Sequence, residues 1–415
     1  MCQTAERLGR TFDLVARKAL GGIISPATTR LVWKTIFGLM GRRYSKCHSL
    51  GEVKHVLVIR PDEIGDVVMI TPFLRELRHN VPNAWITLIV NPQVLNLVDT
   101  CPYVNEILTC QRPRYGLPIT PSLYLRALIL AARSLWHRHF DLVILLRWDV
   151  DYYNSSFLAY FSGAPWRVAY SETVSVLKQK LNCQFDLLFT DVLKTDALKH
   201  EVERNLDILS FLGGEVKENR LELWLNDEDE KKANEILTSQ GGNHGTVLVA
   251  IHAGAGTAKR KWAVELYAQL VNWICVQYQA AIVYVGGNED ALVSRQVASI
   301  AGGIAIHAAG IASLRVTTAI LKRCCLLIGN DSGPIHMAAA MNIPVVVISC
   351  HSYASAPDNA NSPIRFKPWS SRHVVLQPAK PVPPCKQECT AQTAHCILGV
   401  TIEQVKAAVA REMPR

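Results

Sequence analysis

Gly-Asn-Asp-Ser-Gly-Pro-Ile-His-Met-Ala-Ala-Ala, residues 329–340, is the stretch that decides the predicted fold. A short apolar segment, 324–328, precedes it, and a second apolar segment, 345–348, follows the run of alanines. This order predicts a strand, a turn, a helix and another buried strand. Pro334 suits the first helical position because the N–H that proline lacks would be unpaired there anyway.

The turn between this strand and this helix is a candidate anion site. Ser332 or Gly333 can cap the helix. The free amides of Gly333, Ile335 and His336 would then point outward at the positive end of the helix dipole, where phosphate oxygens bind. His336 can add a hydrogen bond or a positive charge. An ordinary capped helix would explain this stretch by itself equally well.

Length and composition predict a globular protein of two domains. The chain has 415 residues, which is too long for one ordinary core, and 49% of them are apolar and 19% charged. No uncharged apolar run reaches the ~18 residues that a transmembrane helix needs. The first 25 residues carry dispersed basic side chains instead of the apolar core of a secretory signal. A cytoplasmic protein is therefore expected.

Residues 1–50 form a basic extension. They hold nine Lys and Arg against two acidic residues, a balance of +7 within a total of +9. Apolar residues alternate with these charges on both sides of Pro26, which predicts basic amphipathic helices that lie on an anionic membrane surface. Packing on the protein itself or on a partner remains open. Nucleic acid is not an expected partner, since no aromatic and basic stacking pattern follows.

Beyond the extension, strands and helices alternate in two rounds. Strands that are apolar throughout predict parallel sheets covered on both faces, and two such domains create a cleft beyond the carboxyl ends of their strands. Five strands are expected in each round, at 53–60, 84–90, 104–108, 142–146 and 167–169, and at 247–251, 281–285, 304–306, 324–328 and 345–348. The predicted units are the extension 1–50, domains 51–226 and 227–398, and a C-terminal helix 399–415.

A candidate base follows the first strand, within residues 59–72. Asp66 lies just past the carboxyl end of that strand, and Gly65 lets the backbone come close to whatever occupies the cleft. Asp66 could also simply cap the next helix. The sequence Gly-x-Gly-x-x-Gly is absent here, so a nicotinamide site is not supported.

A candidate diphosphate loop follows the first strand of the second round. Small residues precede three consecutive cations, which can approach a diphosphate closely and neutralise it. A solvated basic loop is the alternative. The candidate donor contacts in this loop are Gly256, Thr257, Lys259, Arg260 and Lys261.

No metal site is predicted. Most of the twelve cysteines lie in apolar runs, as reduced core residues do. Cys385, Cys389 and Cys396 form a separate group with His395 as the nearest fourth ligand, but adjacent His395 and Cys396 favour poor tetrahedral geometry. The Asp149-Val150-Asp151 sequence suggests a metal-bound Asp-x-Asp site, yet the turn at 329–336 already supplies a phosphate site.

These motifs together resemble those of the bacterial heptosyltransferases of glycosyltransferase family 9, over residues 51 to about 410. The motifs that carry the resemblance are Gly65-Asp66 followed by Thr71-Pro72, then Pro82-Asn83-Ala84, then His252 and Gly254 before a basic run and Trp262, and then Asp331-Ser332-Gly333-Pro334 and His336. The basic run departs from the family pattern, because Arg260 stands where the family has Lys and Ala263 replaces a Pro.

The resemblance implies an α/β fold of two Rossmann-like, doubly wound domains that face each other across a cleft, the GT-B type. It implies inverting, metal-independent transfer of heptose from ADP-heptose to a lipopolysaccharide core, without a cofactor, at the cytoplasmic face of the inner membrane. Asp66 matches the general base, and Glu289 falls near the nucleoside. Asp331, Ser332, Gly333 and His336 match the donor-binding turn. Which of Lys259, Arg260 and Lys261 meets the diphosphate is open.

The acceptor-binding site is predicted in the first domain. Loops of the first domain are expected to bind an anionic glycolipid through arginines, and the candidates are Arg60, Arg112, Arg114 and Arg147. Three other functions remain: transfer from a different nucleotide sugar or to a different acceptor, a nucleotide-sugar-binding protein without catalysis, and a membrane adaptor whose function lies in the extension.

Overall fold

The structure is a computed structural model that describes residues 49–111, 121–153, 155–243, 245–359, 361–370 and 372–413. Most of the basic extension, with its predicted membrane contact, lies outside these residues, as do Arg112 and Arg114. Within the described part of the chain, no helix combines the length and the apolarity that crossing a bilayer requires.

The first half is built on a parallel six-stranded sheet, in the order β3-β2-β1-β4-β5-β6. Its strands are β1 (His55–Arg60), β2 (Trp85–Val90), β3 (Glu106–Thr109), β4 (Leu142–Leu145), β5 (Trp166–Tyr170) and β6 (Asp191–Leu193). Its helices are α3 (Ile64–Val68), α4 (Thr71–Asn80), α5 (Leu95–Val98), α6 (Pro121–Ser134), α7 (Ser155–Phe161), α8 (Val176–Leu181) and α9 (Glu201–Phe211). The central strands β1 and β4 are almost wholly buried, because helices cover both faces of the sheet.

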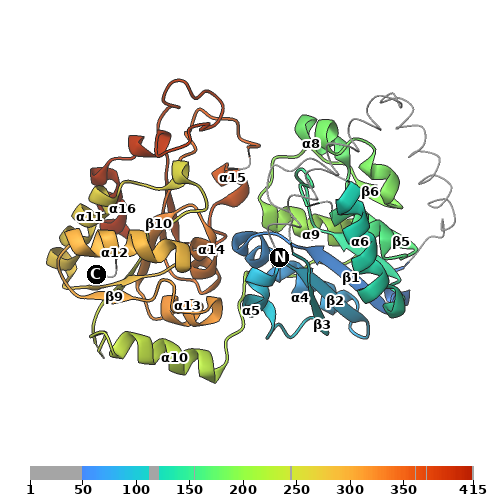
Figure 1. The fold of residues 1–415 in the computed structure, drawn as a ribbon, viewed down its shortest axis with the longest axis horizontal. Helices are drawn as coiled ribbons and strands as arrows, with labels where there is room; N and C mark the ends of the chain where they lie inside the picture. The colour runs from blue at the N-terminus through green and yellow to red at the C-terminus, as the bar shows by residue number, and fades with distance from the viewer. Residues whose placement is uncertain are drawn as a thin grey trace, which may run out of the picture.

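The second half repeats this arrangement, with the order β12-β11-β10-β7-β8-β9, and lies beside the first (Figure 1). Its strands are β7 (Leu248–His252), β8 (Ala281–Tyr284), β9 (Ala305–His307), β10 (Leu326–Asn330), β11 (Val345–Ile348) and β12 (His373–Leu376). Its helices are α10 (Asp227–Thr238), α11 (Val264–Tyr278), α12 (Ala291–Ile300), α13 (Leu314–Leu321), α14 (Gly333–Ala340), α15 (Pro363–Phe366) and α16 (Ile402–Glu412).

The predicted fold class is confirmed, but each sheet has one more strand than the five expected. The additional strands β6 and β12 both lie at a sheet edge and are only partly buried. The opposite edge strands β3 and β9 are partly buried too, but they were predicted. The C-terminal helix α16 packs on α11 and on the second sheet.

Both sheets share the strand order of the dinucleotide-binding fold, in which the chain reverses direction across the sheet between two central strands. This switch point lies between β1 and β4 in the first sheet and between β7 and β10 in the second. Loops that leave the two strands there diverge to opposite faces of the sheet, which opens a crevice at their carboxyl ends. A ligand site is therefore expected where the two switch points meet.

The two halves touch through α3 and α14, and two glycines permit the contact. A Cβ atom on Gly65 would lie 2.6 Å from Cδ2 of His336, and a Cβ atom on Gly333 would lie 2.8 Å from Cβ of Ile64. Both distances are shorter than a real carbon contact. Gly65 and Gly333 thus allow the first turn of each helix to pack against the other.

Polar groups join the halves on the α9 side. His200, which caps α9, accepts a hydrogen bond from the Val202 amide at Nδ1, and its Nε2 lies 2.8 Å from the carbonyl oxygen of Lys367 in the second half. Its ring packs on Trp369 at 4.6 Å between centroids. The neutral tautomer protonated at Nε2 satisfies both bonds, and burial lowers the pKa of His200 to about 4.

We expect acid to weaken the fold through His200. Because the folded pKa is about 4, against 6.5 ordinarily, the unfolded chain takes up a proton first as the pH falls. The stabilisation is complete above pH ~6.5 and is lost between pH ~6.5 and ~4, by about 3 kcal/mol in total. Thermal unfolding temperatures measured across this range should fall less steeply for His200→Asn, which keeps a capping acceptor, than for the natural protein.

His137→Asn is the matched control, because His137 is exposed. It should leave the pH profile unchanged. The interpretation of His200 would be wrong if His200→Asn lost stability with acid as steeply as this control.

Candidate active site

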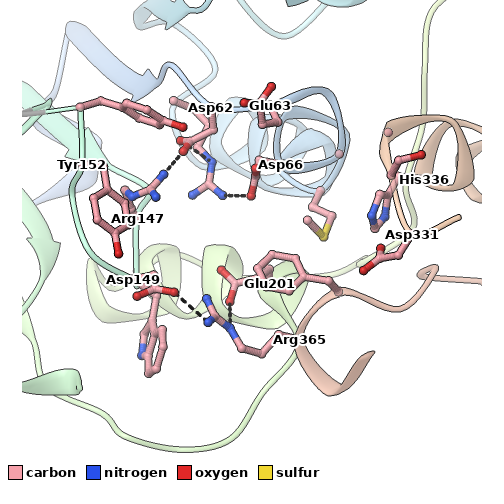
Figure 2. Close-up of a pocket in the computed structure, with 18 of the residues that line it drawn as sticks. Asp62, Glu63, Asp66, Arg147, Asp149, Tyr152, Glu201, Asp331, His336 and Arg365 are labelled. Carbon is pink, nitrogen blue, oxygen red and sulfur yellow. Dashed lines mark hydrogen bonds and ion pairs between the residues drawn. The ribbon is translucent and has the colours of Figure 1, made fainter. Parts of the chain in front are cut away.

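A cavity of about 220 Å³ lies where the two switch points meet. Residues that follow β1 and β4 line it from the first half, together with Glu201 of α9. Residues that follow β7 and β10 line it from the second half, together with Arg365 of α15. Figure 2 shows Asp66 on one side of this cavity and Asp331 and His336 on the other. The carboxylate and the anion-binding turn predicted from the sequence thus face one common space.

Asp66 lies in the first turn of α3 and is paired with an arginine. Arg60 Nη2 donates to Asp66 Oδ1 over 2.8 Å, and about a quarter of the Asp66 side chain stays exposed to the cavity. Burial raises the pKa of Asp66, and the Arg60 charge opposes that shift. Asp66 does not cap its helix: Glu63 occupies the N-cap position. Its free edge is available to a hydroxyl group in the cavity.

Arg60 and Arg147, the two described acceptor candidates, both line the cavity but are also bound to acidic groups. Arg60 Nε lies 3.1 Å from Asp62, and Arg147 pairs with the other oxygen of the same carboxylate. Arg147 Nε also donates to the Val150 carbonyl over 2.6 Å. Asp62 therefore holds both arginines at the cavity wall, as Figure 2 shows. It was not among the predicted site residues.

The turn after β10 has the predicted form, with a difference in its cap. Ser332 occupies the N-cap position of α14, and proline follows in the first turn, but the Ser332 hydroxyl donates to the Asn330 carbonyl instead of accepting from the helix. The first amides of the helix are therefore not capped by this side chain. The Ile335 amide, which was predicted to be free, donates instead to the Ser332 carbonyl over 3.2 Å. Asp331 also lines the cavity, and burial raises its pKa.

The predicted positive charge on His336 is wrong. Burial, followed by the nearby His200, lowers the pKa of His336 to about 3, so its imidazole is neutral near pH 7. Its Nδ1 atom is buried and finds no hydrogen-bond partner among the described residues. The ring is thus limited to the other predicted role, a hydrogen bond to a ligand in the cavity.

The three cations of the loop after β7 point to different places. Arg260 lines the cavity, pairs with the Asn361 amide oxygen and keeps a buried Nε without a partner among the described residues. Lys259 Nζ donates to the carbonyl oxygen of Cys389 over 2.6 Å, away from the cavity lining. Lys261 is not among the lining residues either. Of the three, Arg260 is the cation placed to meet a ligand here.

The remaining donor candidates lie outside this cavity. Gly256 and Thr257 are exposed in the same loop, and Glu289 is exposed in the turn after β8, beyond the neighbouring strand end. Asp290, next to Glu289, packs against Gly254 and Gly286 and accepts a hydrogen bond from the Gly287 amide over 2.9 Å. These residues follow β7 and β8 at the carboxyl edge of the second sheet.

Asn330, which was not a predicted site residue, joins the two loops of the second half. Its Oδ1 accepts from the Trp262 amide and the Tyr267 hydroxyl, at 3.1 and 3.0 Å. Its Nδ2 donates to the carbonyls of Ala253 and Gly254, at 2.9 and 3.0 Å. Because all four hydrogen bonds are made by a wholly buried side chain, the loop carrying Arg260 is fixed against the turn carrying Asp331.

A buried charge cluster on the floor of the cavity was also not predicted. Arg365 Nε donates to Glu201 Oε1 over 2.9 Å, and its Nη1 donates to Asp149 over 2.8 Å, so that one arginine of the second half binds two acids of the first. Arg204 pairs with Glu201 at 2.6 Å and stacks on Trp148 at 3.6 Å. Although burial opposes it, the charge of Arg365 lowers the pKa of Glu201.

The two acids of the Asp149-Val150-Asp151 sequence are thus occupied by the protein. Asp149 pairs with Arg365. Asp151 is buried and accepts from the amides of Ser155 and Ser156 at 3.1 and 2.8 Å, at the start of α7. Their partners are an arginine and helix amides, which explains both carboxylates without a metal ion.

Comparisons with known proteins identify the family of this chain. The profile of glycosyltransferase family 9 (heptosyltransferase) matches residues 129–395, more than half of the chain. The lipopolysaccharide core heptosyltransferase OpsX of Haemophilus influenzae is 19% identical over 326 residues, which are 78% of this chain and 84% of that protein.

Solved structures show the same fold. A family 9 glycosyl transferase from Veillonella parvula superposes with a TM-score of 0.69 at 22% identity, over 88% of this chain and 97% of that one. The ADP-heptose LPS heptosyltransferase II of E. coli superposes with a TM-score of 0.62 at 18% identity, over 86% and 98%. The chain therefore belongs to glycosyltransferase family 9, the heptosyltransferases, and is a glycosyltransferase.

Proposed function

We propose that this protein transfers heptose from ADP-heptose to a lipopolysaccharide core acceptor, with inversion at the anomeric carbon and Asp66 as general base. The observation that carries the proposal is that Asp66 and the turn at Asp331–His336, from opposite halves, line one cavity. The donor and the acceptor class are those that the names of the E. coli and H. influenzae proteins state for them.

Inverting transfer requires this opposition. The acceptor hydroxyl attacks the anomeric carbon from the face opposite the leaving nucleotide, so the group that takes its proton must lie across the sugar from the phosphate site. Asp66, with one edge on Arg60 and the other open to the cavity, suits the proton transfer. Arg60 holds the carboxylate in place, and its charge opposes the rise in the pKa of Asp66 that burial causes.

The leaving diphosphate would be stabilised by the second half. The Gly333 amide at the start of α14 and the guanidinium of Arg260 would supply hydrogen bonds and positive charge where negative charge develops. Arg260 Nε and His336 Nδ1, which find no partner among the described residues, are polar atoms that a bound ligand would satisfy. Asp331 would repel a diphosphate, so we assign it to the hydroxyl groups of the sugar.

The nucleoside would extend out of the cavity, which is smaller than the ~300–1,000 Å³ usual for small-molecule sites. Its route would follow the carboxyl edge of the second sheet, past Gly256 and Thr257 to Glu289. Arg60 and Arg147, together with Arg112 and Arg114, which lie outside the described residues, remain our proposed contacts to the anionic acceptor.

We further propose that the protein works at the cytoplasmic surface of the inner membrane through residues 1–50, whose balance of +7 and interleaved apolar residues favour anionic lipid. Removing residues 1–48 should abolish cosedimentation with anionic vesicles and leave turnover of a soluble acceptor analogue unchanged. Loss of that turnover would contradict a role restricted to the membrane.

Asp66→Asn should lower kcat by ~10²- to 10⁴-fold, because the base is removed, while Asn keeps an oxygen for Arg60. The dissociation constant of ADP, measured by calorimetry, should not change, since Asp66 does not bind the nucleotide. Glu63→Gln, which removes another carboxylate from the same cavity wall, is the control and should lose far less. Full turnover by a folded Asp66→Asn protein would exclude Asp66 as the base.

Arg260→Gln should weaken ADP binding by ~10- to 100-fold, as expected for the loss of ~1.5–3 kcal/mol from a hydrogen bond to a charged group. Lys261→Gln removes the same charge from the adjacent position, outside the cavity lining, and should change the affinity much less. Calorimetric titrations with ADP compare the two variants. The reverse order of effects would move the diphosphate contact to Lys261.

A further inference from the structure

Four side chains with metal-binding atoms meet in the segment between β12 and α16. The thiols of Cys385, Cys389 and Cys396 and one nitrogen of His395 all lie within 4.8 Å of one another. His395 Nδ1 is 3.6 Å from Cys385 Sγ and 3.5 Å from Cys396 Sγ. The three cysteines are buried, and none of them takes part in the proposed reaction.

The two distances from His395 Nδ1 match those around a tetrahedral zinc ion. With Zn–S bonds of ~2.3 Å and Zn–N bonds of ~2.0–2.1 Å, neighbouring nitrogen and sulfur ligands lie ~3.5 Å apart. The two measured N···S distances agree with that value. Three thiolates and one imidazole are also a donor set that selects zinc over harder cations, and four protein ligands close the coordination sphere, as in structural sites.

Backbone amides support the sulfur atoms. The Thr390 amide donates to Cys385 Sγ, and the Val382 amide donates to Cys396 Sγ, both over 3.4 Å. Such hydrogen bonds stabilise the thiolate form that a metal requires and orient the ligands. Three residues separate Cys385 from Cys389 in the sequence, which is a usual spacing for zinc ligands.

The sequence argued against this site because His395 and Cys396 are adjacent. In the structure both reach the same point, since His395 turns its near nitrogen, Nδ1, towards the thiols. Its backbone, at φ −147° and ψ −90°, follows neither a helix nor a strand and lies just before the short 3₁₀ helix Cys396–Gly399. We propose that Cys385, Cys389, His395 and Cys396 bind one structural zinc ion.

The zinc would brace the loop that carries Arg260. Residues 385–396, the zinc segment, make three polar contacts with other loops. The Cys389 carbonyl accepts from Lys259, and the Gln387 carbonyl accepts from the Ala356 amide over 3.1 Å. The Glu388 side chain accepts from Asn359 over 2.9 Å. Asn359 in turn accepts from the amide of Asn361, the residue that pairs with Arg260. Lys259 is therefore a positioning residue, anchored to the zinc segment; this step rests on the proposed function.

The metal content of the purified full-length protein tests the site. Elemental analysis should find one zinc per chain, and intact-mass measurement under denaturing conditions should find all cysteines reduced. Cys389→Ser should lose the zinc, whereas Cys350→Ser, a buried cysteine of the same core outside the cluster, should keep it. A natural protein without stoichiometric metal, with iron in place of zinc, or with a disulfide among Cys385, Cys389 and Cys396 would overturn the proposal.

The natural protein also separates this proposal from the proposed function. Removing zinc with a chelator should lower the unfolding temperature and weaken ADP binding, and added zinc should restore both. A protein that binds zinc in this way and transfers no heptose would sink the proposed function and leave the zinc site standing. A natural protein that transfers heptose but is purified without stoichiometric zinc would exclude the zinc site and leave the proposed function standing.

Discussion

The close contact between α3 and α14 is the constraint on which the site depends. Helix α3 follows β1 of the first sheet, and α14 follows β10 of the second sheet. Each helix contributes a glycine to the contact. The packing of Gly65 on His336 and of Gly333 on Ile64 brings two crevices together that would otherwise open separately to solvent. A side chain at either glycine would need to displace buried atoms of the other half, which a close-packed interior resists.

Buried charges then fix how the halves meet. Arg365 binds Glu201 and Asp149 across the interface, and Arg204 shares Glu201 while stacking on Trp148. Such pairs add little net stability over apolar packing, but removing one partner leaves an uncompensated buried charge at a cost of ~3–5 kcal/mol. Their consequence here is geometric, since the hydrogen bonds are satisfied in a narrow range of orientations of one half against the other.

The same burial explains why the site uses some charges and neutralises others. His336 lies inside the interface, where burial keeps its ring uncharged. Arg260 lines the cavity, and its Nε finds no partner among the residues that the structure describes. Asp66 is held by Arg60 through one oxygen, and about a quarter of its side chain is exposed to the cavity. A neutral ring, a cation and a carboxylate in one cavity match the three needs of the proposed transfer: a contact to the ligand, a partner for the diphosphate and a proton acceptor.

The sequence by itself determined the two parallel sheets, the loops that carry function and the position of Asp66, because apolar periodicity, glycine and helix-capping patterns are local and fold the same way wherever they occur. The edge strands β6 and β12 were not predicted. Only the tertiary structure decided which of the three loop cations faces the cavity, that His336 is neutral, that Asp62, Glu201, Asn330 and Arg365 support the site, and that His395 and Cys396 converge. Those properties arise from burial and from contacts between residues up to 216 positions apart, and no local pattern encodes either.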